Sequence, residues 1–146
     1  MNSSPLRIRW FRVLVAALAV IALSFLILMV IITVDAFVLA FRARGAPDQN
    51  AINHFAARVS PKLMPWLEML LTLVAALCVA RRAEKARIMH GLFIGILTGL
   101  LSLAVTLAFG GRIGLHNLYF FLLVVALGWL GGFLGRKGRV KDEVVA

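Results

Sequence analysis

The sequence predicts an all-α membrane protein, a bundle of four transmembrane helices. Three observations lead to this fold class. In the chain of 146 residues, 62% are hydrophobic and the mean hydropathy is +0.98, whereas a soluble domain is typically about 45–50% apolar. Four apolar runs are long enough to cross a bilayer, which takes about 20 residues. Most basic residues lie beside these runs rather than in a stripe shared with aromatic residues, which argues against nucleic-acid binding.

The first predicted span covers residues 13–39 and follows a basic N-terminal segment, residues 1–12. Its uncharged part, Val13 to Val34, is longer than the apolar region of a secretory signal peptide, which has about 7–15 residues. The small-x-small triplet at residues 17–19 lies inside the run instead of after it. We therefore expect an uncleaved transmembrane helix.

A short amphipathic helix is predicted in the first outer loop, before the second span at residues 63–80. Asp48 is a suitable N-cap, and Ser60-Pro61 is expected to end the helix. Its apolar stripe consists of Ile52, Phe55, Ala56 and Val59. Such a helix is expected either to rest on the outer membrane interface or to be an ordinary helical turn packed over the bundle.

Glycines at helical spacing mark the third and fourth predicted spans, residues 88–109 and 118–134. Each glycine costs a helix about 0.8–1.0 kcal/mol relative to alanine, but small residues let helices in lipid approach closely. We therefore predict a helix-packing face that serves either this bundle or a partner's helix. It is made of Gly91, Gly95 and Gly99 in the third span and Gly128 and Gly132 in the fourth.

The orientation follows from the distribution of positive charge. With a cytoplasmic N-terminus, eleven basic residues lie inside and five outside. The inner set is Arg7, Arg9, Arg12, Arg81, Arg82, Lys85, Arg87, Arg136, Lys137, Arg139 and Lys141, and the outer set is Arg42, Arg44, Arg58, Lys62 and Arg112. Both termini, including the basic segment 136–146, are therefore expected in the cytoplasm, where they would meet anionic lipid.

Two carboxylates, Asp35 and Glu68, are the candidate ion or substrate contacts. We expect both near the outer interface, either at the mouth of the bundle or as solvated or salt-bridged interfacial groups. No catalytic residues, metal ligands or cofactors are predicted. The serines within spans have no base at comparable depth, the histidines lack ligand spacing, and the single cysteine, Cys78, is expected to be a small buried apolar residue.

Two families of four-span proteins resemble this chain in size but differ at their diagnostic residues. Small multidrug transporters carry a glutamate in the middle of the first span, and residues 13–34 contain no acid. The membrane enzymes of eicosanoid and glutathione metabolism carry a polar Glu-Arg and Asn pattern in the second span, and "WLEMLLTLVAALCVARR" lacks it. The sequence therefore assigns no family.

The functional expectation is a small, non-catalytic integral membrane protein with a structural, accessory or assembly role. Its expected location is the bacterial inner (plasma) membrane, and its expected partners are lipid, another membrane protein or further copies of itself. The alternative is a small oligomeric transporter or channel that uses Asp35 and Glu68 at its outer mouth.

Overall fold

The computed structural model describes residues 10–46, 48–83 and 86–137, and these residues form four helices joined by short loops. The helices are α1 (Trp10–Ala43), α2 (Gln49–Arg82), α3 (Arg87–Ala108) and α4 (Leu115–Lys137). All four are long and apolar enough to cross a membrane. The predicted all-helical architecture with four candidate spans is therefore confirmed for the described part of the chain.

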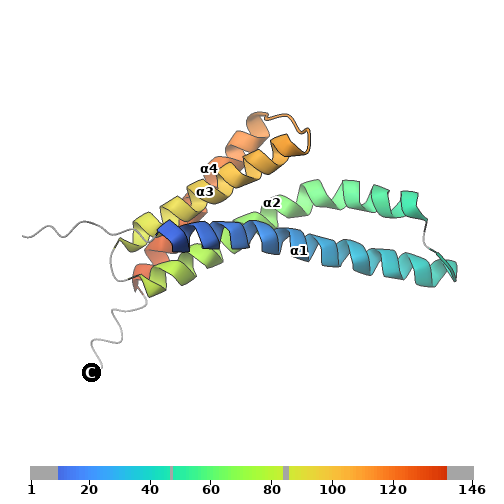
Figure 1. The fold of residues 1–146 in the computed structure, drawn as a ribbon, viewed down its shortest axis with the longest axis horizontal. Helices are drawn as coiled ribbons and strands as arrows, with labels where there is room; N and C mark the ends of the chain where they lie inside the picture. Colours follow the sequence, from blue (N-terminus) through green and yellow to red (C-terminus); the bar gives the residue numbers. More distant parts are fainter. Residues whose placement is uncertain (1–9, 47, 84–85, 138–146) are drawn as a thin grey trace, which may run out of the picture.

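The chain runs up and down as two antiparallel hairpins, α1–α2 and α3–α4 (Figure 1). We call the end where α1 and α3 begin and α2 and α4 finish the terminal end, and the end with loops 44–48 and 109–114 the loop end. The central pair, α2 and α3, contact each other and both outer helices, whereas α1 and α4 make no contact within the described residues. Any site shared by several helices therefore includes α2 or α3.

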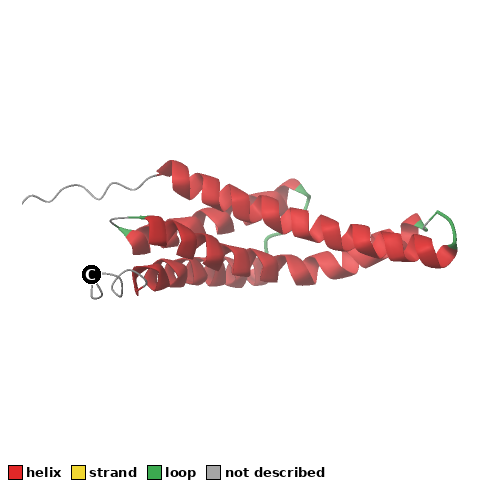
Figure 2. Ribbon diagram, turned by 90° about the horizontal axis from the view of Figure 1, so that it is seen from below, coloured by secondary structure: helices red, strands yellow, loops and turns green. Residues whose placement is uncertain are grey.

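The two hairpins differ in length. With 34 residues each, α1 and α2 are about 51 Å long at roughly 1.5 Å per residue. The 22 residues of α3 and 23 of α4 give about 33–35 Å, close to a hydrocarbon layer of about 30 Å. Figure 2 shows the longer hairpin extending past the shorter one at the loop end, and Figure 1 shows the hairpins diverging there.

One boundary differs from the sequence prediction. Residues 49–60 do not form a separate helix that ends at Ser60-Pro61, because α2 continues through both Pro61 and Pro65. The predicted cap is present, since the Asp48 side chain accepts from the Asn50 backbone N–H at 2.9 Å. The amphipathic stripe is half-buried and belongs to the loop-end part of α2, ahead of the two prolines. Prolines of this kind bend helices, and α2 changes direction along its length (Figure 1).

The buried core occupies only the terminal half of the bundle. Toward the loop end, the last buried residue is Leu28 on α1, Glu68 on α2, Gly99 on α3 and Val124 on α4. Most core side chains are small or β-branched, and the apolar members are Val13, Ala17, Val20, Leu28, Ala76, Ala80, Ile94 and Val124. Small side chains give close helix contacts, so the terminal half is closely packed, whereas the described residues beyond these positions are half-buried or exposed.

Candidate functional site

The glycines of the third span lie against α4, so this face packs within the bundle. A Cβ built on Gly95 would lie 2.8 Å from the carbonyl oxygen of Val124, and one on Gly91 would lie 2.7 Å from the Cα of Gly132. From the other side, a Cβ on Gly128 would lie 2.8 Å from the Cα of Gly95. Because these neighbours are backbone atoms, no side-chain movement can make room. A Cβ built on Gly99 would lie 2.6 Å from the Cδ2 atom of the Phe121 ring.

A second glycine face of α4 packs against α2. A Cβ on Gly131 would lie 2.8 Å from both the Ala76 Cβ and the Leu73 carbonyl oxygen, and one on Gly135 would lie 2.6 Å from the Ala80 Cβ. The sequence shows the same four-residue spacing here, but the helix that this face meets is decided by the fold. Both faces of α4 are thus occupied inside the protein.

Glu68 is buried at the interface between the two central helices. Its side chain is 3% exposed, and its carboxylate accepts a hydrogen bond from the Ser102 hydroxyl of α3. The second carboxylate oxygen, Oε2, is buried and has no hydrogen-bond partner within the protein. A buried carboxylate with an unpaired oxygen is costly, which makes Glu68 the strongest candidate for a functional group.

Four hydroxyl side chains accompany Glu68 on three helices. Thr72 lies one turn from Glu68 on the same face of α2. Thr98 lies one turn from Ser102 on the same face of α3. The loop between α1 and α2 is centred near residue 46, so the antiparallel register places Ser24 at the level of Glu68. Thr72, Thr98 and Ser24 are fully buried. We call Ser24, Glu68, Thr72, Thr98 and Ser102 the polar belt.

The hydroxyls of the polar belt are not equivalent. Ser24 donates to the Val20 carbonyl at 2.9 Å, and Thr72 donates to the Glu68 carbonyl at 2.6 Å. These bonds stay within one helix, as is usual for serine and threonine in apolar surroundings. The Thr98 Oγ1, in contrast, is buried without a partner. The belt therefore contains two unpaired polar atoms, one on α2 and one on α3.

The polar belt lies within the apolar part of the bundle. From Arg81 at the terminal end of α2 to Glu68 is about 20 Å along the helix, and from Arg87 of α3 to Ser102 is about 22 Å. In a hydrocarbon layer of about 30 Å, these side chains would lie beyond its midplane. Glu68 thus lies far from the start of its helix and not near it, as a span starting at residue 63 predicts, because α2 begins at Gln49.

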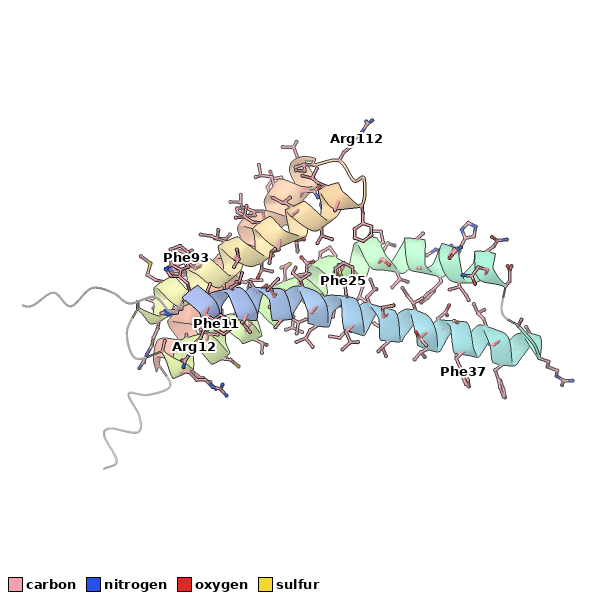
Figure 3. All side chains as sticks on the ribbon, viewed as in Figure 1. Phe11, Arg12, Phe25, Phe37, Phe93 and Arg112 are labelled. Atoms are coloured by element: carbon pink, nitrogen blue, oxygen red, sulfur yellow. The ribbon has the colours of Figure 1, made fainter. Side chains whose placement is uncertain are left out.

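Asp35 lies outside the polar belt. It is about 35 Å along α1 from Arg12, in the part of α1 that extends beyond the buried core, and its side chain is half-buried. In the register of the α1–α2 hairpin it is nearer the level of residue 57 than that of Glu68. Figure 3 shows that Arg112, on the loop between α3 and α4, points away from the bundle. Asp35 and Glu68 therefore do not form one site.

Other candidate groups lie outside the belt. His90 is buried at the terminal end of α3, where its Nδ1 is 2.9 Å from the Ala86 carbonyl oxygen. Cys78 is exposed, contrary to the expectation that it would be buried. Within the described ranges, no three His, Cys, Asp or Glu side chains are grouped closely enough to hold a metal ion.

Two pairs of belt residues have a signal in the sequence, which does not show that the pairs meet. Glu68 and Thr72 are four residues apart, as are Thr98 and Ser102, so each pair lies on one helix face. The short connection between α2 and α3 fixes the register that brings the pairs together. Comparisons with protein-family models, curated proteins and solved structures found no match to this chain.

Proposed function

We propose that this chain is a small transporter of the bacterial inner membrane that moves protons or small cations through the polar belt around Glu68. The observation that carries this proposal is the buried Glu68 carboxylate with its unpaired Oε2. Ionisable residues inside a membrane are costly, and they commonly mark ion or proton pathways. The candidate site is therefore Glu68, and Asp35 is assigned no part in it.

The position of Glu68 relative to the core supports transport over a purely structural role. Among the described residues, Leu28 of α1 is the one that is buried between the belt and the loop end, whereas about 20 Å of packed core lies on the terminal side. This asymmetry resembles a pathway that is open on one side and closed on the other. Transport would then require the α1–α2 and α3–α4 hairpins to change their packing.

The test is proton or cation flux in liposomes that contain the full chain. An imposed pH gradient should collapse faster with the protein than in empty liposomes, and Glu68→Gln should reduce the rate to that of empty liposomes. Asp35→Asn is the matched control, because it also removes one carboxylate charge, and it should leave the rate unchanged. A Glu68→Gln protein that still collapses the gradient would contradict the proposal.

A second candidate, a non-catalytic role in assembly with a membrane partner or with further copies of this chain, is favoured by a different observation. The loop-end part of α1 presents large exposed apolar side chains, including Val34, Phe37 and Phe41, and Figure 3 shows Phe37 pointing away from α2. Purification in mild detergent, followed by mass spectrometry of the intact complex, would test this role. A monomer that carries only lipid would speak against it.

A further inference from the structure

We infer that the loop-end part of the α1–α2 hairpin leans onto the surface of the bilayer through an apolar face of α1. This inference goes beyond the proposed function and does not rest on it. We call residues 31–43 of α1 and 49–61 of α2 the extension. Its exposed apolar face on α1, formed by Val34, Phe37 and Phe41, is the α1 stripe.

The extension lies past the end of the shorter hairpin. Ser102 contacts Glu68, and α3 ends at Ala108, about 9 Å beyond Ser102. The same distance beyond Glu68 brings α2 to Lys62, so residues 49–61 continue for about 20 Å more. Because the length of α3 already matches a hydrocarbon layer of about 30 Å, an upright extension would stand outside that layer.

The α1 stripe is unusually apolar for such a position. Its spacing of three and four residues places it on one helix face, and Phe37 is 73% and Phe41 80% exposed. Asp35, two residues before Phe37, lies on a different side of α1 and is half-buried. Large exposed apolar patches mark contacts with proteins or membranes. The α1 stripe therefore indicates a surface that is covered in the membrane.

The α2 side of the extension has the opposite character. Its exposed side chains include Asn53, His54 and Arg58, whereas its own apolar side chains, such as Phe55 and Val59, are half-buried. The extension is thus an amphipathic unit of two helices, with an apolar face on α1 and a polar face on α2. Elements with this pattern lie at membrane interfaces with the apolar face toward the acyl chains.

The divergence of the hairpins turns the α1 stripe toward the bilayer. Toward the loop end, Figure 1 shows α2 between α1 and the α3–α4 hairpin, and Figure 3 shows Phe37 pointing away from α2. When α3 and α4 stand upright in the membrane, the α1–α2 hairpin leans away from them with α1 on its underside. The length of α1 favours the same tilt, because from Val13 to Phe41, about 42 Å, its one charged residue is Asp35.

The charge at the tip of the hairpin favours lipid over a second copy of the chain. Arg42 and Arg44 follow the α1 stripe and are exposed, and basic residues near a membrane surface are attracted to anionic headgroups. In a symmetric pair of chains the same face meets itself, which would bring like charges at Arg42 together. The occupant of the α1 stripe is therefore the bilayer, with anionic headgroups at the arginines.

The test is spin labelling of single cysteines in the full chain, in liposomes of phosphatidylethanolamine and phosphatidylglycerol. Because Cys78 is exposed, the background is Cys78→Ser. Phe37→Cys carries the label on the α1 stripe, and His54→Cys, at nearly the same level on the α2 face, is the matched control. Oxygen concentrates in lipid, and a water-soluble nickel chelate stays in water. We expect the label to collide mainly with oxygen at residue 37 and mainly with nickel at residue 54.

Two outcomes would overturn the inference. Equal access of nickel to residues 37 and 54 would place the α1 stripe in water. A label at residue 37 that neither reagent reaches would show that protein covers the stripe, which would support assembly instead. Neither readout involves flux, so the inference and the proposed transport function can fail separately.

The role of the arginines has its own test in the Phe37→Cys chain. Arg42→Gln should raise nickel access to residue 37 by about twofold or more, because the tip loses an attraction to anionic headgroups. The matched control is Arg58→Gln, which removes the same charge from the α2 face and should leave nickel access unchanged. Equal effects of the two substitutions would refute headgroup binding by Arg42.

Discussion

The Ser102 hydroxyl donates a hydrogen bond to the Glu68 carboxylate and thereby joins the two central helices at the loop-side limit of the buried core. The bond links α2 to α3, and the two hairpins diverge toward the loop end (Figure 1). On its terminal side lie the buried residues of the core, and on its loop side Leu28 of α1 is the one described residue that is buried. The contact therefore joins α2 to α3 and also holds the carboxylate that is the candidate functional group.

Ser102→Ala should weaken the α2–α3 contact because the Glu68 carboxylate loses the hydrogen-bond donor that α3 supplies. Removing one member of a buried hydrogen bond costs about 1–3 kcal/mol, so we expect the free energy of unfolding to fall by about that amount. Chemical unfolding in detergent, followed by circular dichroism, measures the change. The matched control is Thr33→Ala, whose hydroxyl is exposed and bonded only to its own helix. An equal effect of the two substitutions would contradict the prediction.

Gly95→Ala should separate α3 from α4, since its Cβ would lie 2.8 Å from the Val124 carbonyl oxygen and 2.9 Å from the Val125 Cα. Overpacking of this kind costs about 1–3 kcal/mol, and Gly95→Leu should cost more. Gly114→Ala is the control, because a Cβ there meets nothing within 4 Å. The measurement is the unfolding temperature in detergent, and a Gly95→Ala protein as stable as the Gly114→Ala protein would refute close packing at this position.

Gly135→Ala should destabilise the α2–α4 contact, and a compensating change should restore it. The added Cβ would lie 2.6 Å from the Ala80 Cβ, whereas the nearest backbone atoms of α2 are 3.3 Å away. Ala80→Gly removes the close neighbour, so the double variant should be more stable than Gly135→Ala alone. A double-mutant cycle of unfolding free energies should give a coupling within the range of about 0.5–3 kcal/mol found for residues in contact. A coupling of zero would show that the two positions do not meet.

Both chain termini are expected in the cytoplasm, as the excess of basic residues on that side predicts. A reporter fused after Ala146 should be active if it works in the cytoplasm and inactive if it works only outside. A reporter inserted after Gly45 should show the opposite pattern, since Gly45 lies in the loop between α1 and α2. Activity of the external reporter at Ala146 would reverse the orientation and place the open side of the polar belt in the cytoplasm.

The sequence by itself determined the four helices and their amphipathic and glycine-rich faces, because span length and helical spacing are local properties of the chain. It located the ends of α3 and α4 to within about three residues but not the beginning of α2, since local proline rules predict a helix end at Pro61, whereas α2 continues through it. It also identified the five packing glycines and Glu68, but it did not show which residues they contact.

Only the tertiary structure decided which faces meet. The register of the α1–α2 and α2–α3 hairpins brings Glu68 to the level of Ser24 and into contact with Ser102, and it leaves Asp35 outside the core. The spacing of Gly91 and Gly95 indicates a packing face, but their contact with Gly128 and Gly132 follows from the antiparallel α3–α4 pairing. A helix face is encoded by residues four apart, whereas its partner depends on contacts between segments that are distant in the chain.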